Sequence, residues 1–358
     1  MKKILPYFLI SAVFLGFLFV KHPGVFRYKF NSDLIHDYLR SQDIEDTEDK
    51  IKDRIFLSDS DIYIASGYLY AKGEDPAKYN LHPPAVKYLF GYSTLLTGNP
   101  FYVQIFFGLA LILLTYFLGL KIFKNGLVAF VGTLLLLIDP VFSGMMSEAL
   151  LDLGQAVFAL TYVILMFFYP QSYILQGLSL GLFAASKFWS TAIVFVILIF
   201  TYKIFVKKEK INYTKTLLSF LFSLIVFSLT YLKSGELFNL FAYQGRVLKF
   251  MLDHNSAVQT GGPLFLFLTG FFAPWWGSGM IKSAVWSLFW PVGLISSALM
   301  TIRTRVRDAK FFFYVLPVIY LLLSSTQVPF PRYFILILPY VYLNLASVLE
   351  SLNLIGEK

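Results

Sequence analysis

Long apolar segments separated by short polar ones run through almost the whole chain. The segments at 4–20, 101–120, 190–205 and 311–323 are about as long as a helix needs to cross roughly 30 Å of hydrocarbon. A closed β-barrel would instead show strands of about ten residues with alternating polarity, a pattern that this sequence lacks. The pattern therefore predicts an all-α fold, a polytopic transmembrane helical bundle of about ten membrane helices in one domain over 1–358. The expected membrane helices are 4–20, 84–98, 101–120, 126–141, 146–169, 188–206, 214–232, 283–300, 311–325 and 331–349.

Four groups of basic residues indicate which loops face the cytoplasm, because Lys and Arg are retained on that side of membrane proteins. The groups are Lys2 and Lys3, then Lys207, Lys208 and Lys210, then Arg303, Arg305, Arg307 and Lys310, and finally Lys358. They predict an integral, multi-pass protein of the plasma membrane with a cytoplasmic N-terminus. Residues 21–83 then form a first extracytoplasmic loop, and residues 233–280 form a second one with an interfacial helix at 263–278.

This topology has two consequences inside the bundle. The lysines at 207–210 are cytoplasmic only if the stretch 172–206 crosses the membrane once. We therefore expect a short interfacial or re-entrant piece at 172–186, followed by the crossing at 188–206. Lys121 and Lys124 fall on the outer side in this scheme, against the rule that placed the other basic residues.

Composition narrows the class of protein further. Only 14% of the residues are charged and 57% are hydrophobic, whereas a soluble domain carries about 25% charged residues. The chain has no cysteine, which excludes disulfides, a thiolate nucleophile and cysteine-based metal sites. The net charge of +9 comes from basic groups beside apolar helices, so topology explains it and no nucleic acid partner is expected.

The first external loop is the longest polar segment and the first place to look for chemistry. Ten acidic residues lie between positions 31 and 61, and the dense run at 43–53 is typical of a solvated loop. Asp59 and Asp61 then open an amphipathic stretch that reaches Tyr70 and suits the membrane surface. At a helix start these two carboxylates also suit a purely capping role. His82-Pro83-Pro84 follows, a rigid extended lead into the next helix.

The order of motifs in this region resembles the front of the polytopic glycosyltransferases of the C superfamily (GT-C), in particular the protein O-mannosyltransferase and aminoarabinose transferase branch. The matching residues are Asp59, Tyr63, Ala65, Gly73, His82-Pro83-Pro84, Gly91 and Gly98-Asn99-Pro100. Weaker matches follow in order at 147–152, at 177–187 and at Arg332-Tyr333, so the resemblance covers about residues 55–345. Unlike many members, the chain has Ser60 where they have Glu, and no further domain after about residue 350.

The resemblance implies an enzyme that takes a sugar from a polyprenyl-phosphate carrier and transfers it, with inversion, to an acceptor on the outer face. Asp59 best fits the catalytic acid of the family and would act as general base, with Asp61 as the alternative. His82, Lys187 and Arg332 would contact the donor phosphate, and Glu148, Asp152 and His254 would support the site. The carrier tail would lie in a groove between helices that faces the lipid.

The residues themselves leave other readings open. Lys187 and Arg332 also suit snorkelling at the outer interface. Glu148 and Asp152 lie four apart on one helical face and also suit a pair with a lysine of the bundle. His254 suits the surface of the second external loop.

At the level of function, the alternatives are a transporter or flippase of a lipid-linked saccharide and an inactive membrane scaffold. The expected partners are the lipid-linked donor, membrane lipid, and a lipid, glycan or protein acceptor. No metal ligand is assigned, and a divalent cation stays open.

Overall fold

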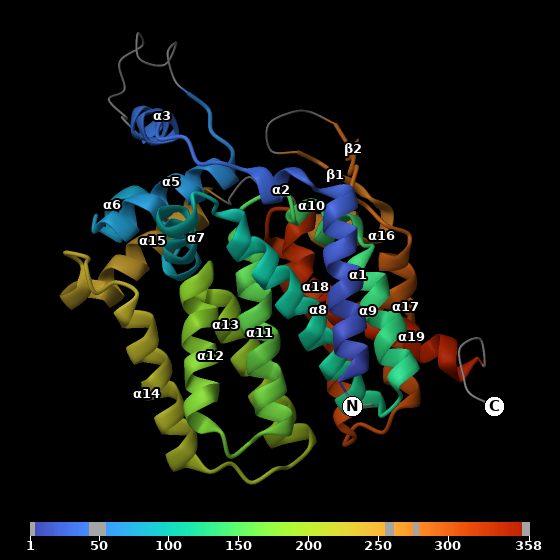
Figure 1. Ribbon diagram of the computed structural model, residues 1–358. Coiled ribbons are helices and arrows are strands. Elements are labelled where there is room, and N and C mark those ends of the chain that lie inside the picture. The colour runs from blue at the N-terminus through green and yellow to red at the C-terminus, as the bar shows by residue number, and fades with distance from the viewer. Residues whose placement is uncertain (1–3, 43–54, 255–260, 275–278, 353–358) are drawn as a thin grey trace.

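The computed structural model describes residues 4–42, 55–254, 261–274 and 279–352. Most helices stand side by side in one bundle, and the N-terminus lies at its lower end (Figure 1). The helices that run along the bundle are α1 (Leu5–Lys21), α8 (Phe101–Phe123), α9 (Gly126–Leu137), α11 (Leu151–Phe168), α12 (Tyr173–Ser186), α13 (Trp189–Thr201), α14 (Tyr213–Leu229), α17 (Phe289–Arg303), α18 (Ala309–Leu323) and α19 (Leu338–Ser351).

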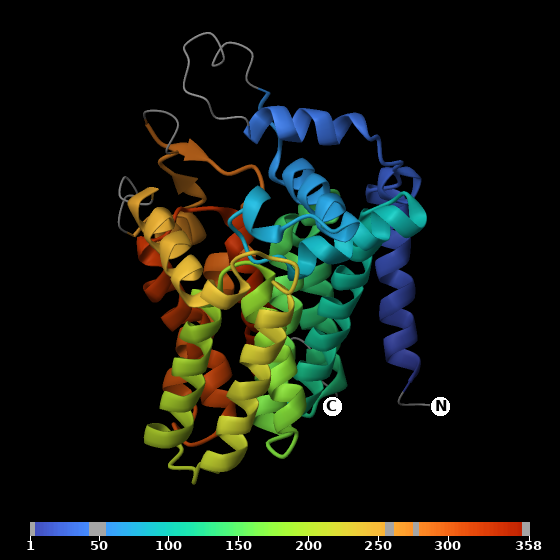
Figure 2. The same ribbon diagram turned by 90° about the vertical axis from the view of Figure 1, so that its left-hand side faces the viewer.

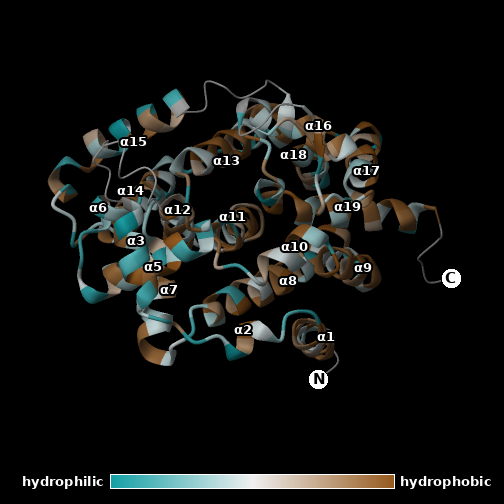
Figure 3. Ribbon diagram, turned by 90° about the horizontal axis from the view of Figure 1, so that it is seen from above, coloured by the Kyte–Doolittle hydropathy of each residue, from teal (hydrophilic) through white to brown (hydrophobic). Residues whose placement is uncertain are grey.

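A second group of elements gathers at the upper end, opposite the N-terminus (Figures 1 and 2). They are α2 (Gly24–Arg27), α3 (Asp33–Gln42), α5 (Asp59–Lys72), α6 (Pro76–Tyr79), α7 (Ala85–Thr97), α10 (Pro140–Met145), α15 (Leu240–His254), α16 (Gly262–Thr269), strands β1 (Phe271–Phe272) and β2 (Ile281–Lys282), and the 3₁₀ helices η2 (Leu237–Asn239), η3 (Ser324–Thr326) and η4 (Pro331–Leu336). Seen from above, polar residues gather in α3, α5 and α6 (Figure 3).

The prediction of an all-α chain is confirmed, apart from the two-residue strands β1 and β2. Within the described residues, three helices are both long and apolar enough to cross a membrane: Phe101–Phe123, Leu151–Phe168 and Trp189–Val206. The third joins α13 to the π-helix η1 (Tyr202–Val206). Five further apolar helices in the described part of the chain are shorter, with 10 to 17 residues.

The segment 84–98, expected as a membrane helix, does not run along the bundle. It forms α7, which lies across the upper end beneath α5 (Figure 2). Gly67 of α5 and Gly91 of α7 allow this crossing, because a Cβ on Gly67 would lie 2.2 Å from the Lys87 carbonyl oxygen and one on Gly91 would lie 1.9 Å from the Gly67 oxygen. Because the backbones of α5 and α7 pack this closely, α7 is held against α5 at the upper end.

The segment 172–186, expected as an interfacial or re-entrant piece, is also placed differently. It forms α12, which stands along the bundle between α11 and α14 (Figure 1). Gly177 and Gly181 face α14, where added Cβ atoms would lie 2.4 Å from the Ser219 oxygen and 2.7 Å from the Ser223 oxygen. Small residues four apart are a usual means of close helix packing in membranes.

These two differences have opposite effects on the topology. The bundle has one helix fewer than expected before α8 and one helix more than expected before α13. The segment 207–210 therefore stays at the lower end of the bundle, where α1 begins. The helices between the two changes run in the direction opposite to the expected one. Lys121 and Lys124, at the end of α8, therefore lie at the lower end, as do the basic groups at 207–210 and 303–310. These two lysines are therefore no longer an exception to the distribution of basic residues from which the topology was predicted.

The region expected to carry an interfacial helix at 263–278 is folded differently. Helix α16 ends at Thr269, because Gly270 adopts a left-handed conformation with φ of +82° and caps it. The antiparallel pair β1–β2 follows, with Phe271 opposite Lys282. The end of the expected helix, at 275–278, lies outside the described residues.

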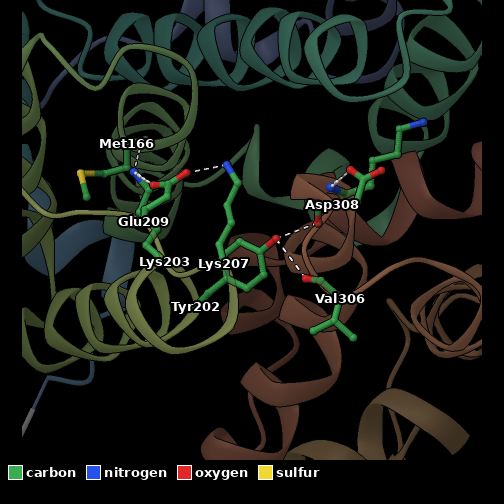
Figure 4. A network of polar contacts seen from close by, with 8 residues as sticks. Met166, Tyr202, Lys203, Lys207, Glu209, Val306 and Asp308 are labelled. Atoms are coloured by element: carbon green, nitrogen blue, oxygen red, sulfur yellow. Dashed lines mark hydrogen bonds and ion pairs between the residues drawn. The ribbon is translucent and has the colours of Figure 1, made fainter.

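A network of polar contacts surrounds η1 and the segment that follows it (Figure 4). Lys203 and Lys207 pair with Glu209 at 3.1 and 2.5 Å. The Tyr202 hydroxyl donates to the Asp308 carbonyl oxygen at 2.7 Å. The Tyr202 hydroxyl therefore links η1 to the segment before α18.

Candidate functional site

Asp59 and Arg332 meet at the upper end although they lie 273 positions apart in the sequence. Asp59 occupies the first turn of α5, and Arg332 lies on η4. The Arg332 Nη2 atom donates to Asp59 Oδ2 at 2.5 Å, and the side chains are 22% and 42% exposed. The pair is therefore partly open to solvent.

Asp61 has a different environment. Ser58 caps α5: its hydroxyl oxygen accepts the backbone N–H of Asp61 at 3.1 Å and donates to Asp61 Oδ2 at 2.7 Å. This arrangement is a variant of the capping box, in which the Asp61 carboxylate accepts the Ser58 hydroxyl and not the Ser58 backbone N–H. Of the two candidate carboxylates, the structure brings Asp59 to Arg332 and engages Asp61 in the cap.

A second ion pair lies deeper. Lys187 Nζ contacts Asp152 Oδ1 at 2.6 Å, and both side chains are almost fully buried. Asp152 is in the first turn of α11, and Lys187 is the first residue after α12. The interpretation of Asp152 as the partner of a bundle lysine is thus confirmed by this contact.

Tyr333 lies between the two ion pairs. Lys187 Nζ is 4.4 Å from the centre of the Tyr333 ring, and the Arg332 guanidinium is 5.7 Å from it. Among the described residues, neither Arg332 Nε nor Asp152 Oδ2 has a hydrogen-bond partner, although both atoms are buried. Unpaired buried polar atoms are costly, so each is available to a ligand.

Glu148 lies on the segment before α11, in the field of the same charges. Its pKa is raised, first by desolvation and then by the nearby carboxylates of Asp59 and Asp152, while Arg332 opposes this change. The neighbouring Ala149 N–H donates to the Ser60 hydroxyl at 2.8 Å and docks the start of α5 here. Glu148 and Asp59 are thus on adjoining segments.

His82 lies beside the deeper pair. Its ring packs edge-on against Phe188 and Tyr63, with centroid distances of 5.0 and 5.8 Å. Lys87, five residues later and buried in α7, donates to the His82 carbonyl oxygen at 2.6 Å. Sequence reasoning missed Lys87, although a lysine inside an apolar helix is itself a signal. His254 ends α15, and its side chain lies outside the described part of the structure.

The described structure also has a groove, and a small hollow that shares Lys187 with this cluster. The groove has a volume of about 470 Å³ and is lined by α7, α12 and α14, with Tyr88, Leu182, Leu229 and Lys233 among its residues. The hollow holds about 20 Å³ and is lined by Lys187 and Phe188 together with residues of α15. In the described ranges, no three His, Asp or Glu side chains gather as metal ligands would.

No family model and no curated protein matches this sequence. Two solved structures are similar in fold, both of ArnT from Cupriavidus metallidurans. The apo structure matches with a TM-score of 0.59 at 14% identity, over 82% of this chain and 55% of ArnT. The structure bound to undecaprenyl phosphate matches with a TM-score of 0.61 at 14% identity, over 89% of this chain and 59% of ArnT.

This chain therefore spans somewhat more than half the length of ArnT. The resemblance to the aminoarabinose transferase branch, first seen in the motifs around Asp59 and His82, is confirmed as a likeness of fold. Over most of its length, this chain has the all-α membrane fold of ArnT.

Proposed function

We propose that this protein is a membrane glycosyltransferase that moves a sugar from a polyprenyl-phosphate carrier to an acceptor at the upper end of the bundle. One observation carries the proposal: a carboxylate, Asp59, and two cations, Arg332 and Lys187, come from distant parts of the chain to the surroundings of Tyr333. The fold of ArnT supports it, and undecaprenyl phosphate bound in one ArnT structure supports the class of carrier.

The chemistry requires a base and a stabilised leaving group. The acceptor hydroxyl oxygen forms a bond to the anomeric carbon, and the bond from that carbon to the phosphate oxygen breaks with its electron pair. Asp59 takes the proton of the hydroxyl as general base. One-step displacement inverts the anomeric centre.

Arg332 and Lys187 would stabilise the departing phosphate. Arg332 Nη2 is engaged by Asp59, whereas the buried Nε has no partner in the described part of the chain and suits a phosphate oxygen. Lys187 lies against the small hollow described above. Fixed cations in a site of low dielectric stabilise developing negative charge more strongly than water does.

The groove between α7, α12 and α14 would hold the carrier tail. Its lining is largely apolar, with Leu178, Leu182, Val226 and Leu229 on its walls, and Lys233 at its edge. It begins beside Ala85, directly after His82-Pro83-Pro84. A tail in this groove would bring its phosphate toward the side of the cluster where His82 and Lys187 lie.

The test is bond cleavage by the purified protein in liposomes. We expect release of radiolabelled sugar from undecaprenyl-phosphate sugars to acceptor or water, with free undecaprenyl phosphate as the second product. Protein-free liposomes give the background. Donor that appears in the opposite leaflet with its sugar still attached would instead support a flippase and contradict the proposal.

The direction of the chain through the membrane is a second prediction. The cysteine-free sequence allows single cysteines to report exposure without background. We expect Thr97→Cys, at the upper end, to react with an impermeant maleimide in intact cells. Lys121→Cys and Thr304→Cys, at the lower end, should react only after permeabilisation. Labelling of Lys121→Cys in intact cells would restore the topology inferred from the sequence alone.

A further inference from the structure

The hydrogen bonds of the turn at 80–82 determine which ring nitrogen of His82 carries a proton. The Asn80 side-chain oxygen Oδ1 accepts the backbone N–H of His82 at 3.1 Å, which forms an Asx turn. Lys87 Nζ donates to the same oxygen at 3.0 Å. A backbone N–H is always a donor, so the Asn80 atom at this position is the oxygen and not the amide nitrogen.

The His82 ring contacts that same oxygen. Its Nδ1 atom lies 3.2 Å from Asn80 Oδ1, and a carboxamide oxygen only accepts hydrogen bonds. Nδ1 must therefore carry a proton. In a neutral imidazole one nitrogen donates and the other accepts, so Nε2 is then the unprotonated acceptor.

The imidazole is held neutral by its surroundings. Burial lowers the pKa of His82 well below its usual value, and the positive charges of Lys187, Lys87 and Arg332 lower it further. No hydrogen bond to Nε2 is formed by the described residues, whereas Nδ1 is engaged. The ring keeps one orientation between Tyr63 and Phe188.

A bare Nε2 cannot donate a hydrogen bond to a phosphate. Phosphate oxygens at neutral pH are acceptors, and Arg332 and Lys187 already supply donors beside them. We infer that His82 binds a hydroxyl group of the substrate, which donates to Nε2, and that Asn80 is the positioning residue that sets this tautomer. This inference rests on the proposed function and replaces the phosphate contact that the sequence resemblance implied for His82.

The tautomer is measured first, because it needs no substrate. Protein labelled with ¹⁵N in its four histidines distinguishes protonated from bare ring nitrogens by NMR, and His82→Gln assigns the signal. We expect a protonated Nδ1 and a bare Nε2 in the wild type. Asn80→Ala should release the ring to the Nε2-protonated form. An Nε2-protonated or doubly protonated His82 in the wild type at neutral pH overturns the inference.

Binding and transfer then locate the hydroxyl. For His82→Ala we expect the affinity for bare undecaprenyl phosphate to stay within about twofold. A loss of roughly three- to tenfold, about the worth of one hydrogen bond, should affect the mannosyl form if the hydroxyl belongs to the sugar. If it belongs to the acceptor, the loss should appear in single-turnover transfer at saturating donor. Asn80→Ala should weaken the same step.

His36→Ala, a change at an exposed histidine of α3, is the matched control and should alter none of these values. If His82→Ala loses the same affinity for the bare and the mannosyl carrier, His82 contacts the phosphate and the inference is overturned. The inference is also overturned if His82→Ala changes neither of these affinities nor the rate of single-turnover transfer. A protein that binds the mannosyl carrier through His82 but never cleaves it would instead overturn the proposed function alone.

Discussion

Asp59→Asn is expected to slow sugar transfer by about 10²- to 10⁴-fold, the usual loss when a positioned general base is removed. Asparagine keeps the size of the side chain and can still accept a hydrogen bond from Arg332, but it cannot take the proton of an acceptor hydroxyl. Carrier binding depends on the cations and the groove, so the affinity for undecaprenyl phosphate should not fall. The measurement is single-turnover transfer beside equilibrium binding of the carrier.

Asp61→Asn is the matched control, because it makes the same change two residues later in the same helix turn. Asp61 lies in the first turn of α5 and accepts from the Ser58 hydroxyl, so neutralising it should cost roughly 0.3–1 kcal/mol of stability and leave the rate of transfer nearly unchanged. Normal transfer by Asp59→Asn, or an equal loss in both variants, would dismiss Asp59 as the base.

The second large effect is expected at the buried pair of Asp152 and Lys187. Lys187→Met leaves the Asp152 carboxylate buried without its partner, and breaking a buried pair from one side typically costs about 3–5 kcal/mol. We expect a clear fall of the melting temperature in detergent. Arg246→Met, at the largely exposed pair with Glu236, should cost less than about 1 kcal/mol.

The double variant Asp152→Leu/Lys187→Met separates stability from function. Apolar replacement of both partners is often neutral for stability, so the melting temperature should return toward that of the wild type. Transfer should stay impaired, because the cation for the phosphate is gone. A double variant with normal stability and normal transfer would show that Lys187 serves only the packing of α11 against α12 and α13.

The pattern of apolar positions predicted the class of fold and most of the long helices, since hydropathy and length suffice for segments such as α8 and α11. It could not place α7 and α12, which have 13 and 14 residues. What distinguishes them is the surface that each one packs on, α5 for α7 and α14 for α12. Such contacts between distant segments are not encoded in local periodicity.

The candidate site divides in the same way. Local motifs identified Asp59, His82 and Arg332, and a strict reading of Ser58-x-x-Asp61 as a capping box would have separated Asp61 from Asp59. The contact of Asp59 with Arg332 depends on η4, which reaches the upper end only in the folded bundle. The roles of Asn80 and Lys87 depend on the turn at 80–82, where a single oxygen accepts from both sides.

The short helix α12 also has a consequence for the surrounding lipid. Its 14 residues span about 21 Å at 1.5 Å per residue, whereas a typical hydrocarbon layer is roughly 30 Å thick. Helix α12 forms part of the groove wall and packs on α14, so the hydrophobic mismatch that it creates lies beside the groove. We expect lipids with shorter chains to gather there, and a bilayer thinned at that flank would bring the lower leaflet closer to the groove.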